Sequence, residues 1–414
     1  MTISAAPSLT FNEPVLRWSA RSDSIAGVEK ELARIWARQD LTTDVDGVAE
    51  RHVSARTSVM NLVVIARRHE LAIRCAATIQ SFTGRHPSRT IVVQGADPDG
   101  PSWIDARIEA HCVLPRADAP EICAETIHLT AGGEGGRHLA ALVTPLIIHD
   151  LPVTVWWPGE PPFASAVARD LLEGADRLVV DGSTWSGDGL ERLREMARMA
   201  TDARLAISDF ALARQSRWRE TIASIFDDPD FLPYLRSIRR IAISYASHDE
   251  EEMPGATNLV KPIYHVAWLA SRLGLTVVKP LAAASGPAHH HPTRARVAAG
   301  ARAVVGRGYV ATLTDGRAEV AVVVRPVLSP MPAGTTLRVE LLAERRGSEL
   351  RADVTAEAET VRARVWQDGF EVLDRRFLAP RRSDVDLLAE AIESGRREPV
   401  AIGTLRTAAE IIGG

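Results

Sequence analysis

The first half of the chain alternates short apolar runs with amphipathic stretches of helical period. Residues 25–36 place Ile25, Val28 and Leu32 on one helical face, directly after a Ser-Asp-Ser segment that can cap a helix. Further helices are predicted at 70–82, from about 137 with a disturbance at Pro145, and at 164–174. Strands are predicted at 61–66, 89–94, 106–114, 124–130, 152–157 and 177–181. This alternation predicts an α/β N-terminal domain, layered around a largely parallel or mixed sheet.

The second half of the chain changes from helical to strand-rich. Asp-Gly pairs at 315–316 and 368–369 lie between alternating runs and are hairpin signals. Helices are predicted at 191–200, 215–226, 258–273, 384–393 and 404–412, and strands at 303–313, 317–325, 336–344, 349–356, 360–366 and 370–377. We therefore predict an α+β C-terminal domain with an antiparallel sheet, and we divide the chain into domains 1–205 and 206–414.

Composition excludes several classes of protein. The hydrophobic share of 46% and the charged share of 25% are ordinary for a packed globular chain. The 49 basic and 53 acidic residues give a net charge of −4, which gives no electrostatic reason to expect a nucleic-acid or membrane-surface partner. The sequence shows neither a signal peptide nor the ~20 uninterrupted apolar residues of a membrane span. We therefore expect a cytoplasmic protein.

Neither disulfides nor bound metals are expected. Cys75, Cys112 and Cys123 form an odd, sparse set without a CxxC pair, which predicts no disulfide framework and no zinc site and fits a reducing compartment. Adjacent histidines at 289–291 lie between proline- and glycine-containing segments, so we interpret them as an exposed loop rather than a metal site. The acidic run 249–252 is interpreted as a solvated loop. No metal or cofactor is predicted.

A glycine-rich segment, 132–138, follows a predicted strand and precedes a predicted helix. Backbone N–H groups at such a place can hold a phosphate, which makes a sugar-phosphate or nucleotide site the alternative function. However, the segment lacks the endings of both the P-loop and the dinucleotide-binding motif, and Glu134 adds a negative charge. A tight connection is therefore the favoured interpretation. The residues of the alternative site are Gly133, Gly135, Gly136, Arg137 and His138.

The most unusual segment is the apolar run that ends in two tryptophans and a proline-rich exit, 151–162. Successive side chains of a strand face opposite ways, so Trp156 and Trp157 can each pack beneath a different helix layer. Alternatively, the exit forms a rigid aromatic anchor for a partner protein. The residues of this predicted partner surface are Trp157, Pro158, Glu160 and Pro161. No G-x-S-x-G elbow or catalytic cysteine motif is present, so no catalytic residue is predicted.

The run from Arg137 to Pro162 resembles the signature region of the glucose-6-phosphate dehydrogenase assembly protein (OpcA) family. The similarity is most specific in Asp150-Leu151-Pro152 and in Trp156-Trp157-x-Gly159-x-Pro161-Pro162. Weaker similarities follow in order along nearly the whole chain, at 25–36, 57–62, 86–89 and 214–218 and in the strand-rich C-terminal part. The resemblance implies a non-catalytic protein that helps to assemble, or allosterically activates, an oligomeric glucose-6-phosphate dehydrogenase. It thereby implies a role in NADPH production by the oxidative pentose phosphate pathway.

Overall fold

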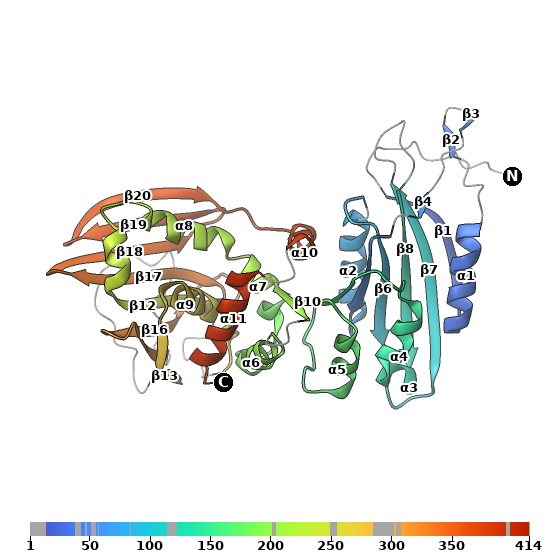
Figure 1. Ribbon diagram of the computed structural model, residues 1–414, viewed down its shortest axis with the longest axis horizontal. Coiled ribbons are helices and arrows are strands. Elements are labelled where there is room, and N and C mark those ends of the chain that lie inside the picture. The colour runs from blue at the N-terminus through green and yellow to red at the C-terminus, as the bar shows by residue number, and fades with distance from the viewer. Residues whose placement is uncertain are drawn as a thin grey trace. The chain divides into compact units, whose positions relative to one another are not determined.

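The computed structural model forms two compact units (Figure 1). The first contains the chain up to Val180 together with 204–206 and 383–396, and the second contains 181–203, 207–382 and 397–414. The structure describes residues 14–37, 43–45, 48–50, 55–56, 58–82, 84–113, 122–200, 204–248, 255–284, 302–303, 308–394 and 398–413.

The sheet of the first unit is mixed, as predicted. Its strand order is β1-β7-β8-β6-β5-β9-β10-β11, with the short β4 paired to β8. From β8 to β10 neighbouring strands are parallel, whereas β1–β7 and β7–β8 are antiparallel. The bounds are β1 (Val15–Ser22), β4 (Ala55–Arg56), β5 (Met60–Ile65), β6 (Ser88–Gly95), β7 (Trp103–Val113), β8 (Ile122–Gly132), β9 (Val153–Trp157), β10 (Arg177–Val180) and β11 (Ala206–Asp209).

The predicted helices of the first unit are present, but one is broken. The stretch that begins near 137 becomes two short helices and a 3-10 turn, and Pro145 lies in that turn because its ring cannot continue an α-helix. The bounds are α1 (Ile25–Ala37), α2 (His69–Phe82), α3 (Glu134–Arg137), α4 (Leu139–Val143), η1 (Thr144–Leu146), α5 (Ala166–Glu173) and α10 (Asp384–Glu393). Helix α10 packs on α2, although the two are far apart in the sequence.

The second unit contains the predicted antiparallel sheet with helices. Its strand order is β13-β15-β16-β12-β17-β18-β19-β20, and β12–β16 is its parallel pair. The strand bounds are β12 (Ile238–Ser247), β13 (Thr276–Ala283), β14 (Arg302–Ala303), β15 (Tyr309–Thr314), β16 (Glu319–Leu328), β17 (Thr336–Arg345), β18 (Ser348–Ala356), β19 (Thr360–Gln367) and β20 (Phe370–Leu378). The helix bounds are η2 (Gly182–Thr184), α6 (Leu190–Met199), α7 (Phe210–Ala213), α8 (Ser216–Phe226), η3 (Leu232–Ser237), α9 (Val260–Leu273) and α11 (Pro399–Ile411). A two-stranded ribbon, β2 (Thr43–Val45) and β3 (Val48–Glu50), completes the described elements.

Several strands lie where the sequence pattern indicated mainly helices or made no assignment, among them β1, β11, β12 and β13. Strand β12 occupies the middle of the second sheet, and β13 forms one of its edges. The residues of β12 are nearly all buried after Arg239 and Arg240, so they lack the polar-apolar alternation that identifies a half-exposed strand. Because this strand is buried between two neighbouring strands and against a helix layer, the sequence pattern did not identify it as a strand.

Candidate functional site

The segment predicted as a partner surface leaves the middle of the first sheet. Strand β9 pairs with β5 on one side and β10 on the other, and all five of its residues are buried. Trp156 and Trp157 are each 1% exposed, so their indoles fill opposite faces of the sheet. Pro158 and Pro161 are also buried, whereas Glu160 is half-buried. In this structure Glu160 is therefore the one residue of the predicted set that offers surface to a partner.

The glycine-rich segment is occupied by its own local contacts. Gly133 has a φ of +57°, and a Cβ there would lie 2.8 Å from the carbonyl oxygen of Gly100, so both strain and space require glycine. The Gly133 amide donates to the carbonyl of Asp97 at 3.0 Å, and the Glu134 amide donates to Oγ of Ser102 at 3.1 Å. Two amides that could hold a phosphate are thus already bonded.

The charged end of the same segment pairs with carboxylates. A guanidinium nitrogen of Arg137 lies 2.6 Å from a carboxylate oxygen of Asp99 and another lies 3.5 Å from Glu134. His138 lies 3.3 Å from the second oxygen of Glu134. The structure brings the five residues of the predicted anion site together, but it surrounds their positive groups with acidic side chains.

A buried ionisable cluster lies at the ends of β10 and β11, and sequence reasoning missed it. Asp209 accepts hydrogen bonds from the Tyr264 hydroxyl at 2.6 Å, the Gly182 amide at 2.9 Å and the Ala211 amide at 2.8 Å. Asp181 accepts from the Ser183 hydroxyl at 2.5 Å and from Arg214 at 2.7 Å. The sequence does carry a signal for this cluster, because an aspartate directly follows each of two apolar runs. The carboxyl ends of parallel strands meet at one sheet edge, so these two aspartates could be expected to lie close together.

Burial and mutual repulsion set the titration of this cluster. Burial, and after it the charge of Asp181, raises the pKa of Asp209 to about 6, although the hydrogen bond from Tyr264 opposes the rise. Burial also raises the pKa of the Tyr264 phenol, and it lowers the pKa of the nearby Lys261 amine. The hydroxyl of Tyr264 therefore stays a donor, and within the second unit the cluster ties α9 to Asp209.

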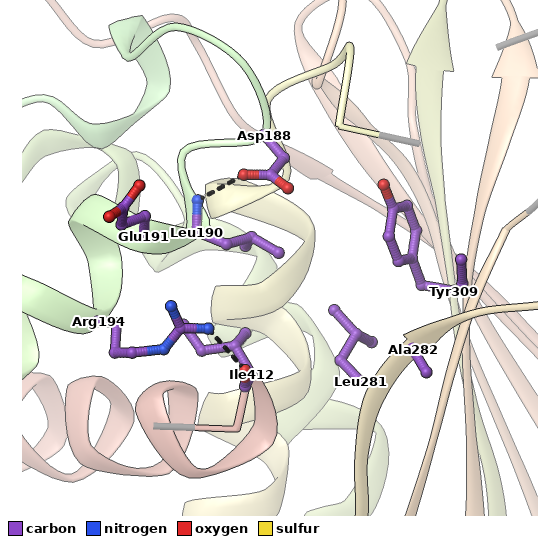
Figure 2. A pocket seen from close by; sticks show the side chains of 9 residues that line it. Asp188, Leu190, Glu191, Arg194, Leu281, Ala282, Tyr309 and Ile412 are labelled. Carbon is purple, nitrogen blue, oxygen red and sulfur yellow. Dashed lines mark hydrogen bonds between the residues drawn. The ribbon is translucent and has the colours of Figure 1, made fainter. Parts of the chain in front are cut away.

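A polar cavity of about 390 Å³ opens in the second unit (Figure 2). Its charged lining residues are Asp188, Glu191 and Arg194, and the guanidinium of Arg194 already donates to the carbonyl of Ile412 at 2.8 Å. The hydroxyl of Tyr309 accepts from the Gly255 amide at 2.8 Å. With two carboxylates around one engaged guanidinium, the lining is unsuited to an anionic sugar phosphate.

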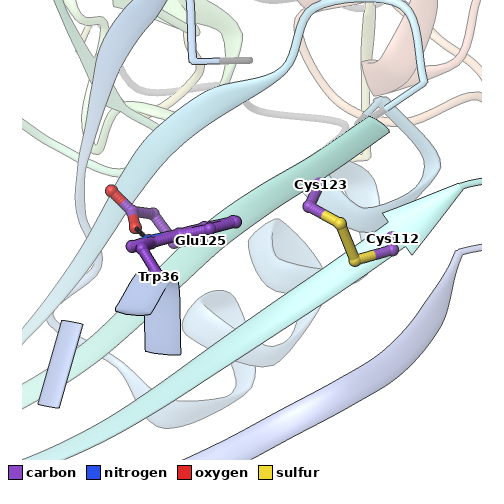
Figure 3. Close-up of a disulfide and its surroundings, with 4 residues drawn as sticks. All are labelled: Trp36, Cys112, Cys123 and Glu125. Carbon is purple, nitrogen blue, oxygen red and sulfur yellow. Dashed lines mark hydrogen bonds between the residues drawn. A yellow bond between two sulfur atoms is a disulfide. The ribbon is translucent and has the colours of Figure 1, made fainter. Parts of the chain in front are cut away.

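The cysteine prediction was wrong in one respect, because Cys112 and Cys123 form a disulfide (Figure 3). They are direct partners in the antiparallel β7–β8 pair, with their Cα atoms 4.0 Å apart. The separation of 11 positions in the sequence did not indicate this pairing, which follows from the register of β7 and β8. Cys75 is a free, buried thiol, and burial raises its pKa to about 12, so its reactive thiolate is disfavoured at neutral pH.

Figure 3 also shows the polar contacts close to this disulfide. The indole of Trp36 on α1 donates to a carboxylate oxygen of Glu125 on β8 at 2.6 Å. The other carboxylate oxygen of Glu125 pairs with Arg89 of β6, which also donates to the carbonyl of Leu146 at 2.9 Å. These contacts hold α1 and the η1 turn against the sheet, so they stabilise the fold of the first unit.

The described residues were compared with what a metal site and a membrane-spanning helix require. Within those ranges no group of three His, Cys, Asp or Glu side chains could hold a metal ion. The histidines at 289–291 and the acidic run 249–252 lie outside the described residues. None of the described helices is both long and apolar enough to cross a membrane.

Solved structures similar to this chain include two bacterial oxidoreductases. An NAD-binding oxidoreductase from Klebsiella pneumoniae has 11% identity and a TM-score of 0.44, over 86% of this chain and 98% of that one. An oxidoreductase from Sinorhizobium meliloti has 11% identity and a TM-score of 0.38, over 84% of this chain and 87% of that one. A likeness at this level carries no statement about function.

Sequence relatives are more informative. Two cyanobacterial proteins whose names assign them to the OxPP cycle as OpcA are 27% identical over 199 residues in Synechocystis sp. and 26% identical over 177 residues in Synechococcus elongatus. The matches cover 48% and 42% of this chain but only 39% and 37% of those relatives, so the matched region spans well under half of their length. The family described as the glucose-6-phosphate dehydrogenase subunit matches with its N-terminal domain at 79–198 and with its C-terminal domain at 205–400. Because these two matches span most of the chain, the protein belongs to the OpcA family of glucose-6-phosphate dehydrogenase assembly proteins.

Proposed function

We propose that this chain is a non-catalytic assembly factor and allosteric activator of glucose-6-phosphate dehydrogenase. The observation that carries the proposal is the pair of family matches, which follow each other along the chain in the order N-terminal domain, then C-terminal domain. In this role the chain binds the enzyme oligomer in the cytoplasm and supports NADPH production by the oxidative pentose phosphate pathway.

The local chemistry supports a binding role over a catalytic one. In the glycine-rich segment, amides of Gly133 and Glu134 are bonded and Arg137 faces carboxylates. In the buried cluster, Asp209 accepts a hydrogen bond from Tyr264 and Asp181 accepts one from Arg214. These carboxylates therefore hold the fold together and do not face a substrate position in solvent. Neither place combines a free nucleophile with a positioned base, which is the arrangement that acid-base or covalent catalysis uses.

Activation follows if the chain binds the active state of the enzyme more tightly than the inactive one. A coupling free energy of about 1–3 kcal/mol corresponds to a roughly 5- to 150-fold shift in affinity. Glu160 remains part of the proposed contact, because its side chain is half-exposed at the exit of β9. A Glu160→Arg variant that folds normally and activates fully would remove this segment from the proposed interface.

The test is an assay of NADPH formation by the enzyme from the same organism, with and without this chain in slight excess. We expect a higher rate or a lower apparent KM for glucose 6-phosphate. We expect no NADPH formation from this chain alone. An unchanged rate, together with separate elution of the two proteins, would overturn the proposal.

A further inference from the structure

One face of the second sheet carries an ordered pattern of charges. Along β12 and β16–β19, alternate residues such as Val324, Val339 and Val354 are buried and apolar, and the helices in close contact with these strands are α8 and α9 (Figure 1). The intervening residues face the other side of the sheet. That second side, from β15 to β20, is called the charged face below.

The strand register arranges the charged face in rows. At one end, cross-strand neighbours form an arginine row that runs Arg325, Ser244, Arg338, Thr355, Arg362 and Arg376. At the other end lies a glutamate row of exposed residues, in which Glu344 and Glu349 are direct partners and Glu319 begins β16. Glu319 and Arg325 lie six residues apart on one strand, a separation of roughly 20 Å, so they cannot pair within one chain.

Two middle rows lie between them and mix apolar groups with opposite charges. The row next to the arginine row contains Ala242, Glu340, Asp353 and Arg364, and the row next to the glutamate row contains Arg240, Leu342, Arg351 and Trp366. The carboxylates of Glu340 and Asp353 are buried and share Arg338, at 2.5 and 2.6 Å. Arg351 and Arg364 lie over the ring of Trp366, with their guanidinium carbons 4.1 and 4.9 Å from its centroid.

Several buried polar atoms of the charged face lack a partner within the described chain. They are the Nε atoms of Arg240, Arg338, Arg351 and Arg364, and one carboxylate oxygen of Asp353. These atoms are covered by the chain itself, so the groups that a second copy could reach are the exposed charges at the two ends of the face.

We propose that two copies of this chain pack face to face through the charged face, about a two-fold axis that runs across the strands between the two middle rows. This symmetry inverts the order of the rows in the second copy. Glu319 then lies opposite the partner's Arg325, and Glu344 lies opposite the partner's Arg338. In the middle rows, Trp366 meets the partner's Arg364.

The alternative axis, parallel to the strands, is disfavoured by charge. It places Arg325 opposite the partner's Arg362, and Arg240 opposite the partner's Arg351. Like charges that meet directly across an interface cost several kcal/mol. The register therefore favours one of the two symmetric arrangements, in which Glu319 and Glu344 each lie opposite an arginine of the partner.

The area of the charged face suits a stable dimer. Seven strands spaced by about 4.8 Å, and four rows spaced by about 6.8 Å, give a face of roughly 30 by 20 Å. This flat area of about 600 Å² approaches the ~800 Å² per partner of a standard interface before side-chain relief is counted. Sheets that pack face to face in this way keep their strands within about 30° of each other, so long arginine side chains can reach across.

The test is a charge swap measured by light scattering and by sedimentation over a range of concentrations, without the enzyme. The wild-type chain is expected at twice 45.0 kDa. Arg325→Glu and Glu319→Arg each create like-charged pairs across the interface, and each is expected to raise the dimer dissociation constant at least tenfold. The double variant restores opposite charges at both symmetric contacts, and we expect it to recover most of the dimer.

Arg217→Glu on α8, which is 59% exposed, is the matched control and should leave the mass unchanged. Thermal unfolding of each variant verifies folding, and Glu319→Arg at an exposed strand end keeps the test valid if Arg325→Glu fails to fold. A wild-type chain that stays monomeric, single variants that dimerise like wild type, or a double variant that does not recover would each overturn the proposal. None of these outcomes depends on whether the chain activates the dehydrogenase.

Discussion

Replacing Asp209 by Asn is expected to remove a specific pH dependence of stability. In the folded chain burial raises the pKa of this carboxyl to about 6, against an ordinary value of 3.8. Between these pH values the unfolded chain has already released the proton that the folded chain retains. The free energy of unfolding therefore falls as the pH rises. A difference of about two pH units corresponds to about 3 kcal/mol, lost between about pH 4 and pH 6 and constant above that range.

The measurement is urea unfolding of wild type and Asp209→Asn at intervals from pH 4 to pH 7.5. Other groups titrate in both proteins, so the informative quantity is the difference between the two free energies of unfolding. We expect wild type to lose about 3 kcal/mol relative to the variant as the pH rises through this window.

Asp315→Asn provides a control that should not change with pH in this window. Backbone amides of Ala318 and Arg317 lower the pKa of the exposed Asp315 carboxyl, so its contribution to stability is lost only as the pH falls below 3.8 and is constant from pH 4 to pH 7.5. Parallel pH profiles for wild type and Asp209→Asn would refute the assignment of a raised pKa to Asp209.

Three further outcomes follow from the described contacts. Cys112→Ser is expected to lower the free energy of unfolding by about 3 kcal/mol, because the Cys112–Cys123 bond closes a loop with a sequence separation of 11; equal urea midpoints under oxidising and reducing conditions would contradict this. Trp157→Ala is expected to destabilise the chain by about 3–5 kcal/mol in urea unfolding, since the indole is buried. A near-neutral effect would instead support a place for this residue on the partner surface. Glucose 6-phosphate and NADPH are expected to leave the thermal midpoint unchanged, and a stabilisation that Arg137→Ala abolishes would instead support the anion site.

Much of the fold was predictable because the sequence carries strong local signals. Apolar runs such as 61–66 and 89–94, separated by an amphipathic stretch, correctly predicted parallel strands around a helix. The alternation after residue 317 correctly predicted an antiparallel sheet. Strand β12 was missed because residues 241–247 are all buried, which removes the alternation that identifies strands.

The site chemistry was less predictable because it depends on register and on long-range contacts. Asp181 and Asp209 are 28 positions apart in the sequence, yet both lie where a strand of one sheet ends. Cys112 meets Cys123 only because β7 and β8 pair in one particular register. The arginine and glutamate rows likewise arise from the pairing of seven strands, and no local pattern of charges in the sequence reveals them.

We propose that this chain acts through glucose-6-phosphate dehydrogenase and has no such activity itself. The most direct test follows NADPH formation by that enzyme at subsaturating glucose 6-phosphate while this chain is titrated in. We expect a saturable rise in rate that ends near stoichiometric addition, with no NADPH formed by this chain alone. A rate that stays flat at every ratio, with no complex seen by co-elution, would contradict it.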